Sequence, residues 1–425
     1  MLRLFPTRIA VAAFSAARAV LAQAEKVEII IDAGSTGSRM YVFHSNTDGV
    51  LLHSKIVGKK KPGLSSFAEK PEGALQPLQW LFAKFMKEEG PKYYGRAIGV
   101  KIFGTAGMRL LPSSKREGVW KSVSSGLNDY FRGDVADKLQ FQLLNTETIE
   151  GEQEGFFALM GVNYLVKQMQ NVGQPCERHG ILDLGGSSTQ IAIPNDCNRI
   201  TRQNSFIRSF PESGMELTRE RVNKLFTAAE RKSCYFSGFE SSSAGSSSSG
   251  GKPCADLVRA AMEHDKGSPH HMQKDWKKLK NKNLKFIAVS GYMYVTHFAR
   301  WLLQQHYPEL DYLKEFPAPK LKSVKQAAEK LCLLEWQSKV KEGHEYTSKS
   351  KLPHRCFELH YIYTLLHMYT NGCDECSNIT FTEEINGSEV EWPIGAWLYF
   401  AEKAKKQLPG SSSSGVKKPP PKVEL

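Results

Sequence analysis

Apolar and polar residues alternate along the chain with two periods, one typical of strands and one typical of helices. The apolar run that starts at Val27 is followed by a glycine turn and a second apolar run at 40–43, which predicts a hairpin. Further apolar runs at 100–103 and 180–184 end in small residues and predict strands. Amphipathic helices are predicted at 74–88, 114–131 and 155–169. This mixture predicts an α/β protein.

The chain has 425 residues, more than one hydrophobic core usually serves, so we expect two lobes. The Ser/Gly-rich tract 241–251 lies between Cys234 and Cys254 and is predicted to be a flexible loop. Residues 409–425 are rich in serine, lysine and proline and contain no apolar span of membrane length. We expect them to form a disordered tail.

The N-terminal segment 1–24 has Arg3 and Arg8, then an apolar region that Arg18 interrupts, and an A-x-A site before Glu25, which predicts a signal peptide. A mitochondrial transit peptide and an uncleaved membrane anchor are the alternatives. The chain has 8 cysteines, an even number that favours disulfides in an oxidising compartment. The sequons at Asn378 and Asn386 are candidate glycosylation sites and favour the same compartment.

The formal net charge of +13 suits polyanionic ligands, but much of the excess lies in solvated lysine runs. No recognised nucleic-acid module accompanies these runs, so we do not expect nucleic acid binding. The pair Cys373-x-x-Cys376 is typical of a redox or metal site as well as of a disulfide, but no second C-x-x-C completes a zinc site.

Two segments repeat one design, a strand that ends in an aspartate and is followed by a turn of small residues. The first is Asp32-Ala-Gly-Ser-Thr-Gly-Ser-Arg39, and the second is Asp183-Leu-Gly-Gly-Ser-Ser-Thr-Gln190. The amides and hydroxyls of such turns can surround a phosphate, and aspartate is a natural ligand of hard cations. One such turn could be structural alone, but two copies favour a pair of phosphate hairpins.

Two further motifs lie between the hairpins. The segment Phe103 to Pro112, FGTAGMRLLP, ends an apolar strand in residues small enough for the backbone to approach a ligand. The segment Ile149 to Gly155, IEGEQEG, places acids at the start of a largely apolar helix. Helix capping is the favoured explanation for Glu150 and Glu152.

The four motifs together resemble the apyrase, or nucleoside triphosphate diphosphohydrolase, family in sequence, order and spacing, from about Val27 to Leu408. The GSTGS turn is closer to the Golgi and secreted nucleoside diphosphatases than to the cell-surface apyrases. The resemblance implies the actin and hexokinase superfamily fold, with two RNase H-like lobes and a nucleotide cleft between them. It places lobe I at 27–166 plus about 393–408, and lobe II at 167–392.

The resemblance also implies a site. Glu154 would accept a proton from the attacking water, which Ser188 and Gln190 would fix. Asp32 and Asp183 would hold Mg²⁺ or Ca²⁺ through water. The residues implied to cradle phosphate are Gly34, Ser35, Thr36, Gly37, Thr105, Ala106, Gly186 and Ser187.

Weaker matches concern the base and the disulfides. The segment Phe286 to Tyr294 resembles the family's F-x-x-x-S segment, so Tyr292 or Tyr294 would stack on the base, although an aromatic beside an apolar strand is as often part of the core. The segment CFELHYI from Cys356 resembles C-x-D-L-x-Y-I, with glutamate in place of aspartate, and WPIGA from Trp392 resembles W-x-L-G-A. The resemblance implies the bridges Cys234–Cys254 and Cys332–Cys356, while Cys176 with Cys197 and Cys373 with Cys376 rest on proximity.

The expected activity is removal of terminal phosphates from nucleoside di- or triphosphates, by a secreted or Golgi-lumenal monomer that meets membranes only if residues 1–24 are not cleaved. A kinase or exopolyphosphatase of the same superfamily is one alternative, because both use paired Asp-Gly hairpins. A nucleotide-binding module without catalysis is the other. Glu154 followed by glycine, together with Gln190, favours hydrolysis over both.

Overall fold

The computed structural model describes residues 26–133, 135, 137–169, 177–196, 200–239, 252–272, 274–275, 284–340 and 344–407. The predicted signal peptide 1–24, the Ser/Gly loop 241–251, the tail 409–425, Cys176 and Cys197 lie outside these residues. None of the described helices combines the length and the apolar character that a bilayer-spanning helix needs.

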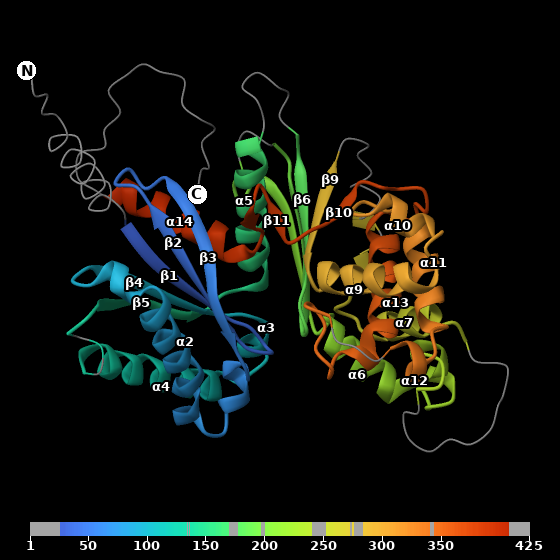
Figure 1. Cartoon of the computed structure of the whole chain (residues 1–425), viewed down its shortest axis with the longest axis horizontal. Helices are drawn as coiled ribbons and strands as arrows, with labels where there is room; N and C mark the ends of the chain where they lie inside the picture. The colour runs from blue at the N-terminus through green and yellow to red at the C-terminus, as the bar shows by residue number, and fades with distance from the viewer. Residues whose placement is uncertain are drawn as a thin grey trace, which may run out of the picture. The chain divides into compact units, whose positions relative to one another are not determined.

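The chain folds as two compact units, and each is described by itself. Unit 1 runs to Gly104 and includes Leu110–Thr148, while unit 2 contains Thr105–Arg109 and the chain from Ile149 onward. Each unit is built on one five-stranded sheet. Helices and strands of both are labelled in Figure 1.

Unit 1 has the strand order β3-β2-β1-β4-β5. Its strands are β1 (Lys26–Ala33), β2 (Ser38–Ser45), β3 (Leu51–Lys60), β4 (Ala97–Gly104) and β5 (Gln140–Thr148). Its helices are α2 (Leu75–Glu88) and α4 (Ser113–Arg132), with the 3-10 helices η1 (Leu64–Phe67), η2 (Pro71–Ala74) and η3 (Gly90–Tyr93). The apolar stripe of α2 buries Leu78, Leu81, Phe82 and Phe85 completely, as helical spacing requires. Each such side chain contributes about 1.5–3 kcal/mol through burial.

Unit 2 has the strand order β10-β9-β6-β7-β8. Its strands are β6 (His179–Leu184), β7 (Ser188–Pro194), β8 (Ser205–Pro211), β9 (Lys285–Ser290) and β10 (Ile379–Phe381), with the small hairpin β11 (Glu384–Ile385) and β12 (Ser388–Glu389). Its longer helices are α5 (Gly151–Met169), α6 (Met215–Leu225), α7 (Cys254–His264), α9 (Gly291–His306), α11 (Leu321–Cys332), α13 (Arg355–Tyr369) and α14 (Trp392–Gln407). Shorter helices are α3 (Ala106–Arg109), α10 (Asp311–Glu315), α12 (Trp336–Lys339), η4 (Glu230–Cys234), η5 (Pro269–Met272) and η6 (Leu352–His354).

The two sheets share one topology. In each, three consecutive strands pair antiparallel, and the fourth strand pairs parallel with the first. The fifth strand then pairs parallel with the fourth. β1 therefore corresponds to β6, so Asp32, opposite Arg39, is equivalent to Asp183, opposite Gln190. The prediction of an α/β protein is confirmed, and both sheets are mixed.

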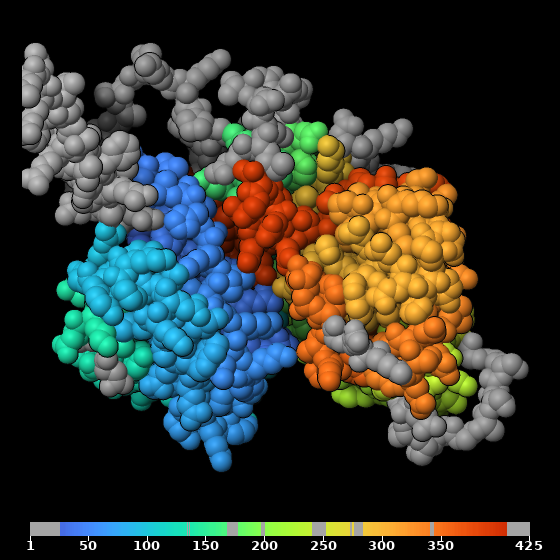
Figure 2. Space-filling model, viewed as in Figure 1, coloured from blue at the N-terminus to red at the C-terminus, as the bar shows by residue number. Residues whose placement is uncertain are grey.

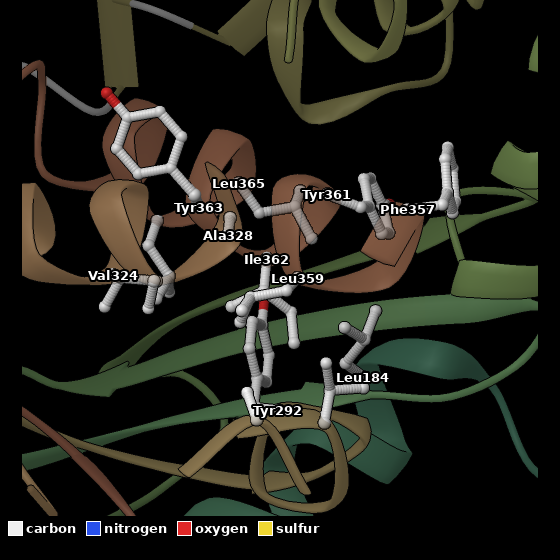
Figure 3. Packing of buried hydrophobic residues seen from close by; sticks show 14 of the residues in the cluster. Leu184, Tyr292, Val324, Ala328, Phe357, Leu359, Tyr361, Ile362, Tyr363 and Leu365 are labelled. Atoms are coloured by element: carbon white, nitrogen blue, oxygen red, sulfur yellow. The ribbon is translucent and has the colours of Figure 1, made fainter. Parts of the chain in front are cut away.

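The main core of unit 2 lies between its sheet and the helices α7, α9, α11 and α13. Figure 3 shows part of this core, in which the ring of Tyr292 points toward Leu359 and Ile362 of α13. In the space-filling view, residues coloured yellow and orange form one side of this unit (Figure 2). α5 packs along β6, β7 and β8.

The helix α14 packs closely along α5. A Cβ added to Gly395 would lie 1.7 Å from the carbonyl oxygen of Phe157, and one added to Gly161 would lie 2.4 Å from Ile394. The glycine of the WPIGA segment is therefore required by the close approach of two helices. Like α5, α14 belongs to unit 2 in the structure.

Three disulfides join described cysteines: Cys234–Cys254, Cys332–Cys356 and Cys373–Cys376. The first two are the pairs that the sequence resemblance implies. The bridge from Cys332 to Cys356 links the end of α11 to the start of α13, and the bridge from Cys234 to Cys254 joins η4 to the start of α7.

Candidate functional site

The second predicted phosphate hairpin is a tight turn between β6 and β7. The amide of Gly185 donates to the carbonyl of Ser188 at 2.9 Å and closes the turn. Asp183 is 7% exposed at the end of β6, and its carbonyl accepts a hydrogen bond from Thr189 Oγ1 at 2.8 Å. The predicted residues Asp183, Gly186 and Ser187 thus lie within one short segment.

Glu154 lies in the first turn of α5, where a salt bridge fixes its side chain. Arg109 Nη1 donates to Glu154 Oε2 at 2.9 Å and to the carbonyl of Ile149 at 3.0 Å. Arg109 Nη2 donates to Ser188 Oγ at 3.3 Å. One guanidinium therefore links Glu154 to the residue that follows the turn.

Gln190 completes this cluster. Its Nε2 donates to Ser188 Oγ at 2.8 Å and to Ser209 Oγ at 3.2 Å. Because Ser188 Oγ accepts from both Arg109 and Gln190, its own proton must point to a third partner. The structure brings together all three residues predicted to act on water: Glu154, Ser188 and Gln190.

The carboxyl of Glu154 is tuned by opposing influences. Burial raises its pKa above the ordinary value of 4.5, the Arg109 guanidinium lowers it, and the negative charge of Asp183 raises it. The net direction is upward. A carboxyl with a raised pKa is suited to take up a proton near neutral pH.

The amides of the second turn are oriented by the start of α6. The backbone N–H groups of Met215 and Glu216 donate to the carbonyls of Gly185 at 3.0 Å and Gly186 at 2.8 Å. Because the C=O and N–H of a trans peptide point in opposite directions, the amides of Gly186 and Ser187 face away from α6. This orientation suits amides that bind an anion.

The first predicted hairpin lies in unit 1, between β1 and β2, and contains Asp32 and the phosphate candidates Gly34, Ser35, Thr36 and Gly37. The chain after β3 lies against this turn. A Cβ added to Gly63 would lie 2.5 Å from the carbonyl oxygens of Gly34 and Ser35. In unit 2 a Cβ added to Gly214 would lie 2.4 Å from Gly186.

Gly63 and Gly214 occupy equivalent positions. Each precedes the helix that follows the third strand of its sheet. Both have negative φ angles, −68° and −81°, so it is space rather than backbone conformation that requires glycine.

Thr105 and Ala106 lie at the start of α3, and both are nearly buried, at 5% and 7% exposure. The carbonyl of Thr105 accepts hydrogen bonds from the amides of Met108 and Arg109, each at 3.0 Å. These bonds set the direction in which the Arg109 side chain leaves the backbone.

The two aromatic candidates for base binding differ in exposure. Tyr292 is completely buried in the core of unit 2 and has no surface to offer a base (Figure 3). Tyr294 is partly exposed, stacks on Tyr346 at a centroid distance of 5.8 Å, and donates to Glu391 Oε1 at 3.4 Å. The strand ends at Ser290, so both tyrosines lie on α9.

Sequence reasoning gave no role to Arg109 or Ser209. Arg109 lies in the motif 103–112, which otherwise consists of small and apolar residues. Its charge in such a segment was the one feature of the sequence that could have indicated a role in the site. Ser209 lies on β8, outside every motif, and its contact with Gln190 follows from the pairing of β7 with β8.

The chain matches the model of the GDA1/CD39 (nucleoside phosphatase) family over residues 19–219 and 219–413. It is 31% identical to Golgi apyrase of Saccharomyces cerevisiae over 204 residues, 42% of this chain and 31% of that protein. It is 36% identical to guanosine-diphosphatase of Schizosaccharomyces pombe over 168 residues, 39% of this chain and 29% of that protein. The matched stretches span less than a third of the length of these two relatives.

A solved structure shares the fold. The nucleoside triphosphate hydrolase structure from Neospora caninum superposes with a TM-score of 0.58 at 16% identity, and the match covers 93% of this chain and 97% of that chain. This likeness and the two equivalent sheets confirm the predicted fold. Since the family model covers both phosphate hairpins and the Glu154 cluster, the chain belongs to the GDA1/CD39 family of nucleoside phosphatases.

Proposed function

We propose that this protein hydrolyses the terminal phosphate of nucleoside di- or triphosphates by direct attack of water. One observation carries the proposal: the cluster of Arg109, Glu154, Ser188 and Gln190 beside the second phosphate turn. It combines a base of raised pKa with polar groups that can orient a water molecule. Family membership and the diphosphatase and apyrase relatives support the substrate class.

In this proposal Glu154 acts as general base. Because Arg109 donates a hydrogen bond to Oε2 of Glu154, the other carboxylate oxygen, Oε1, takes the proton from water. The Ser188 hydroxyl and the Gln190 side chain hold that water. Because a phosphoanhydride leaving group departs without much help, positioning and charge neutralisation supply most of the acceleration.

The family consists of divalent-cation-dependent phosphatases. Among the residues that the structure describes, no group of three or more His, Cys, Asp or Glu could hold a metal ion directly. Asp32 and Asp183 are hard oxygen ligands at equivalent strand ends, which fits an ion that keeps most of its own water. We propose that these two carboxylates hold Mg²⁺ or Ca²⁺ through water, and that the bound ion supplies charge neutralisation at the phosphates.

The remaining site residues keep their proposed roles. The turn 34–37, Thr105, Ala106, Gly186 and Ser187 cradle the phosphates. The partly exposed Tyr294 is the better of the two candidates for the base, because Tyr292 is buried.

The test is phosphate release from ADP, GDP, UDP, ATP, GTP, AMP and polyphosphate, measured with Mg²⁺, with Ca²⁺ and with chelator. Glu154→Gln is compared with wild type, and Glu152→Gln, in the same helical turn, is the matched control. We expect metal-dependent release that spares AMP. Loss of the general base should slow it by roughly 10² to 10⁴.

Either of two results would remove the proposal. One is turnover by Glu154→Gln at the wild-type rate. The other is absence of release unless an acceptor alcohol is added, which would indicate a kinase. The panel also decides between diphosphates, triphosphates and polyphosphate as the preferred substrate.

We further propose that the protein works in the lumen of the secretory pathway or outside the cell. The three disulfides require an oxidising compartment, and one of the relatives is named a Golgi apyrase. Expression of the full chain with a C-terminal tag tests this, since glycosylation and protection from protease in intact vesicles are expected. A tagged chain that is unglycosylated and cytosolic would contradict it.

A further inference from the structure

One motif of the sequence has no part in the chemistry proposed above. The segment Cys356 to Ile362 forms the first half of α13, and two of its polar residues, Glu358 and Tyr361, are each completely buried. Burial of a carboxylate and a phenol is unfavourable unless each finds partners. Tyr361 finds its partner in the segment that leads into α6, and Glu358 finds partners in α6 and in α13 itself.

Tyr361 forms a hydrogen bond to Ser213, two residues before the start of α6. Its hydroxyl donates to the carbonyl of Ser213, which is itself completely buried. The Ser213 hydroxyl donates to Asp265 Oδ2 at 3.3 Å, and the same oxygen lies 3.0 Å from Arg221 Nη2 of α6. Ser213 is therefore held from two sides.

Glu358 contacts α6 itself. Its Oε1 lies 3.6 Å from Arg219 Nη1, and its Oε2 accepts a hydrogen bond from Arg355. Since Glu358 and Tyr361 are three positions apart, they lie on the same face of α13. That face holds α6 at its first turns.

The start of α6 in turn holds the phosphate turn. No side chain caps this helix; instead the amides of Met215, Glu216 and Leu217 donate to the carbonyls of Gly185 and Gly186. The first amides of an α-helix have no carbonyl partner within the helix, so these three amides find their partners in the turn. Any shift of α6 along its axis would therefore turn the Gly185 and Gly186 peptides.

We propose that Tyr361 is a positioning residue for phosphate binding: through Ser213 and the start of α6, it fixes the direction of the Gly186 and Ser187 amides. Glu358 assists by holding Arg219. The expected effect on kcat/KM rests on the proposed function. The effect of Tyr361 on the start of α6 can be measured without turnover.

The test compares Tyr361→Phe with Tyr312→Phe. Tyr312 is a matched control, because it is also buried in unit 2 and its hydroxyl also donates to a backbone carbonyl, that of Thr296, at 2.7 Å. Both variants lose one buried hydrogen bond, so similar losses of Tm are expected. Only Tyr361→Phe should lower kcat/KM, by roughly ten- to hundredfold, since small displacements of binding groups have effects of this size.

Amide hydrogen exchange provides the second readout. In Tyr361→Phe the amides of Met215, Glu216 and Leu217 should exchange faster than in wild type, while in Tyr312→Phe they should not. Arg219→Gln is a milder variant should Tyr361→Phe fail to fold, and it should show the same two changes to a smaller extent.

Equal kcat/KM and equal exchange in Tyr361→Phe and Tyr312→Phe would overturn the inference. If the wild-type protein releases no phosphate, the proposed function fails, and hydrogen exchange alone decides whether Tyr361 holds the turn.

Discussion

Arg109 Nη1 lies 2.9 Å from Glu154 Oε2, and the two side chains are only 13% and 10% exposed. Burial alone would push the pKa of Glu154 far upward, and Arg109 restrains that rise. The same guanidinium reaches Ser188, so it connects the base to the residue proposed to hold water. The pairing thus affects both the protonation and the position of the proposed general base.

The pH profile should respond to Arg109. A base works only when deprotonated, so activity should fall as pH drops through the pKa of Glu154, which lies above 4.5. Replacing Arg109 by Met removes the influence that lowers this pKa and should move the acidic limb of kcat/KM to higher pH. Arg109→Lys keeps the charge and should move it less. Profiles from about pH 4 to about pH 9 measure both shifts.

Arg132→Met, at the exposed end of α4, is the control for loss of one positive charge. It should leave the limb in place. All variants share one substrate, so the ionisation of its phosphates affects each profile equally. A limb at or below the wild-type pH in Arg109→Met would contradict the assignment of Glu154 as base.

Ionisation of Glu154 should affect stability and activity in opposite directions. As pH rises through its pKa, activity should increase and the contribution of this carboxyl to stability should be lost. A carboxyl whose pKa is raised by folding supports the folded state below its unfolded pKa, and this contribution is lost as pH rises through the folded pKa. Glu154→Gln removes the buried charge. The Tm of Glu154→Gln relative to wild type should therefore increase between about pH 4 and about pH 8. A difference in Tm that does not change with pH would show that the pKa is not raised.

The two glycines behind the phosphate turns should not tolerate a methyl group. Gly63→Ala and Gly214→Ala would each place a Cβ within 2.5 Å of backbone atoms of the adjacent turn. We expect each to reduce kcat/KM by roughly 10²-fold, because the turn would have to move away from the position in which it is proposed to bind phosphate.

Gly118→Ala on α4 is the control, because its added Cβ would meet Pro71 at 3.6 Å, an ordinary contact. It should retain activity and gain up to about 1 kcal/mol from the higher helix propensity of alanine. Full activity in Gly63→Ala or Gly214→Ala would show that the corresponding turn does not bind phosphate.

The two sequons should differ in use. Asn386 is exposed in the turn between β11 and β12. The Asn378 side chain donates to the carbonyl of Leu284 at 2.8 Å and is partly buried. In the full chain expressed through the secretory pathway, we expect Asn386→Gln to remove the larger share of the glycosidase-sensitive mass, and Asn378→Gln to remove little. The reverse result would show that Asn378 is modified before its contact with Leu284 forms.

Local patterns were sufficient to predict the strands that carry Asp32 and Asp183, because an apolar run followed by a glycine turn specifies a hairpin by itself. They also placed Glu154 at the start of a helix. The hydrogen bond from Gln190 to Ser209 could not be predicted, since it depends on the pairing of β7 with β8, which the turn leaves open. The helix α14 was expected beside the first lobe, and its contact with α5 depends on two glycines more than 200 residues apart.

The role of Arg109 lay outside sequence reasoning for the same reason. Its partner Glu154 is 45 positions away, and only the packed structure brings the two together. For Tyr292 the sequence left two roles open, because an aromatic residue after a strand can either contact a ligand or pack in the core. Its complete burial in the structure shows that it packs in the core.

The close contact between α5 and α14 also affects how the protein is made. Unit 1 is complete once Thr148 has been synthesised, so it can fold while the rest of the chain is still on the ribosome. α5, which carries Glu154, finds its glycine-lined partner only when α14, the last helix that the structure describes, has emerged. Until then the side of α5 that α14 covers lacks its packing partner. A chain stalled before Trp392 would carry every proposed catalytic residue and still lack the helix that supports the base.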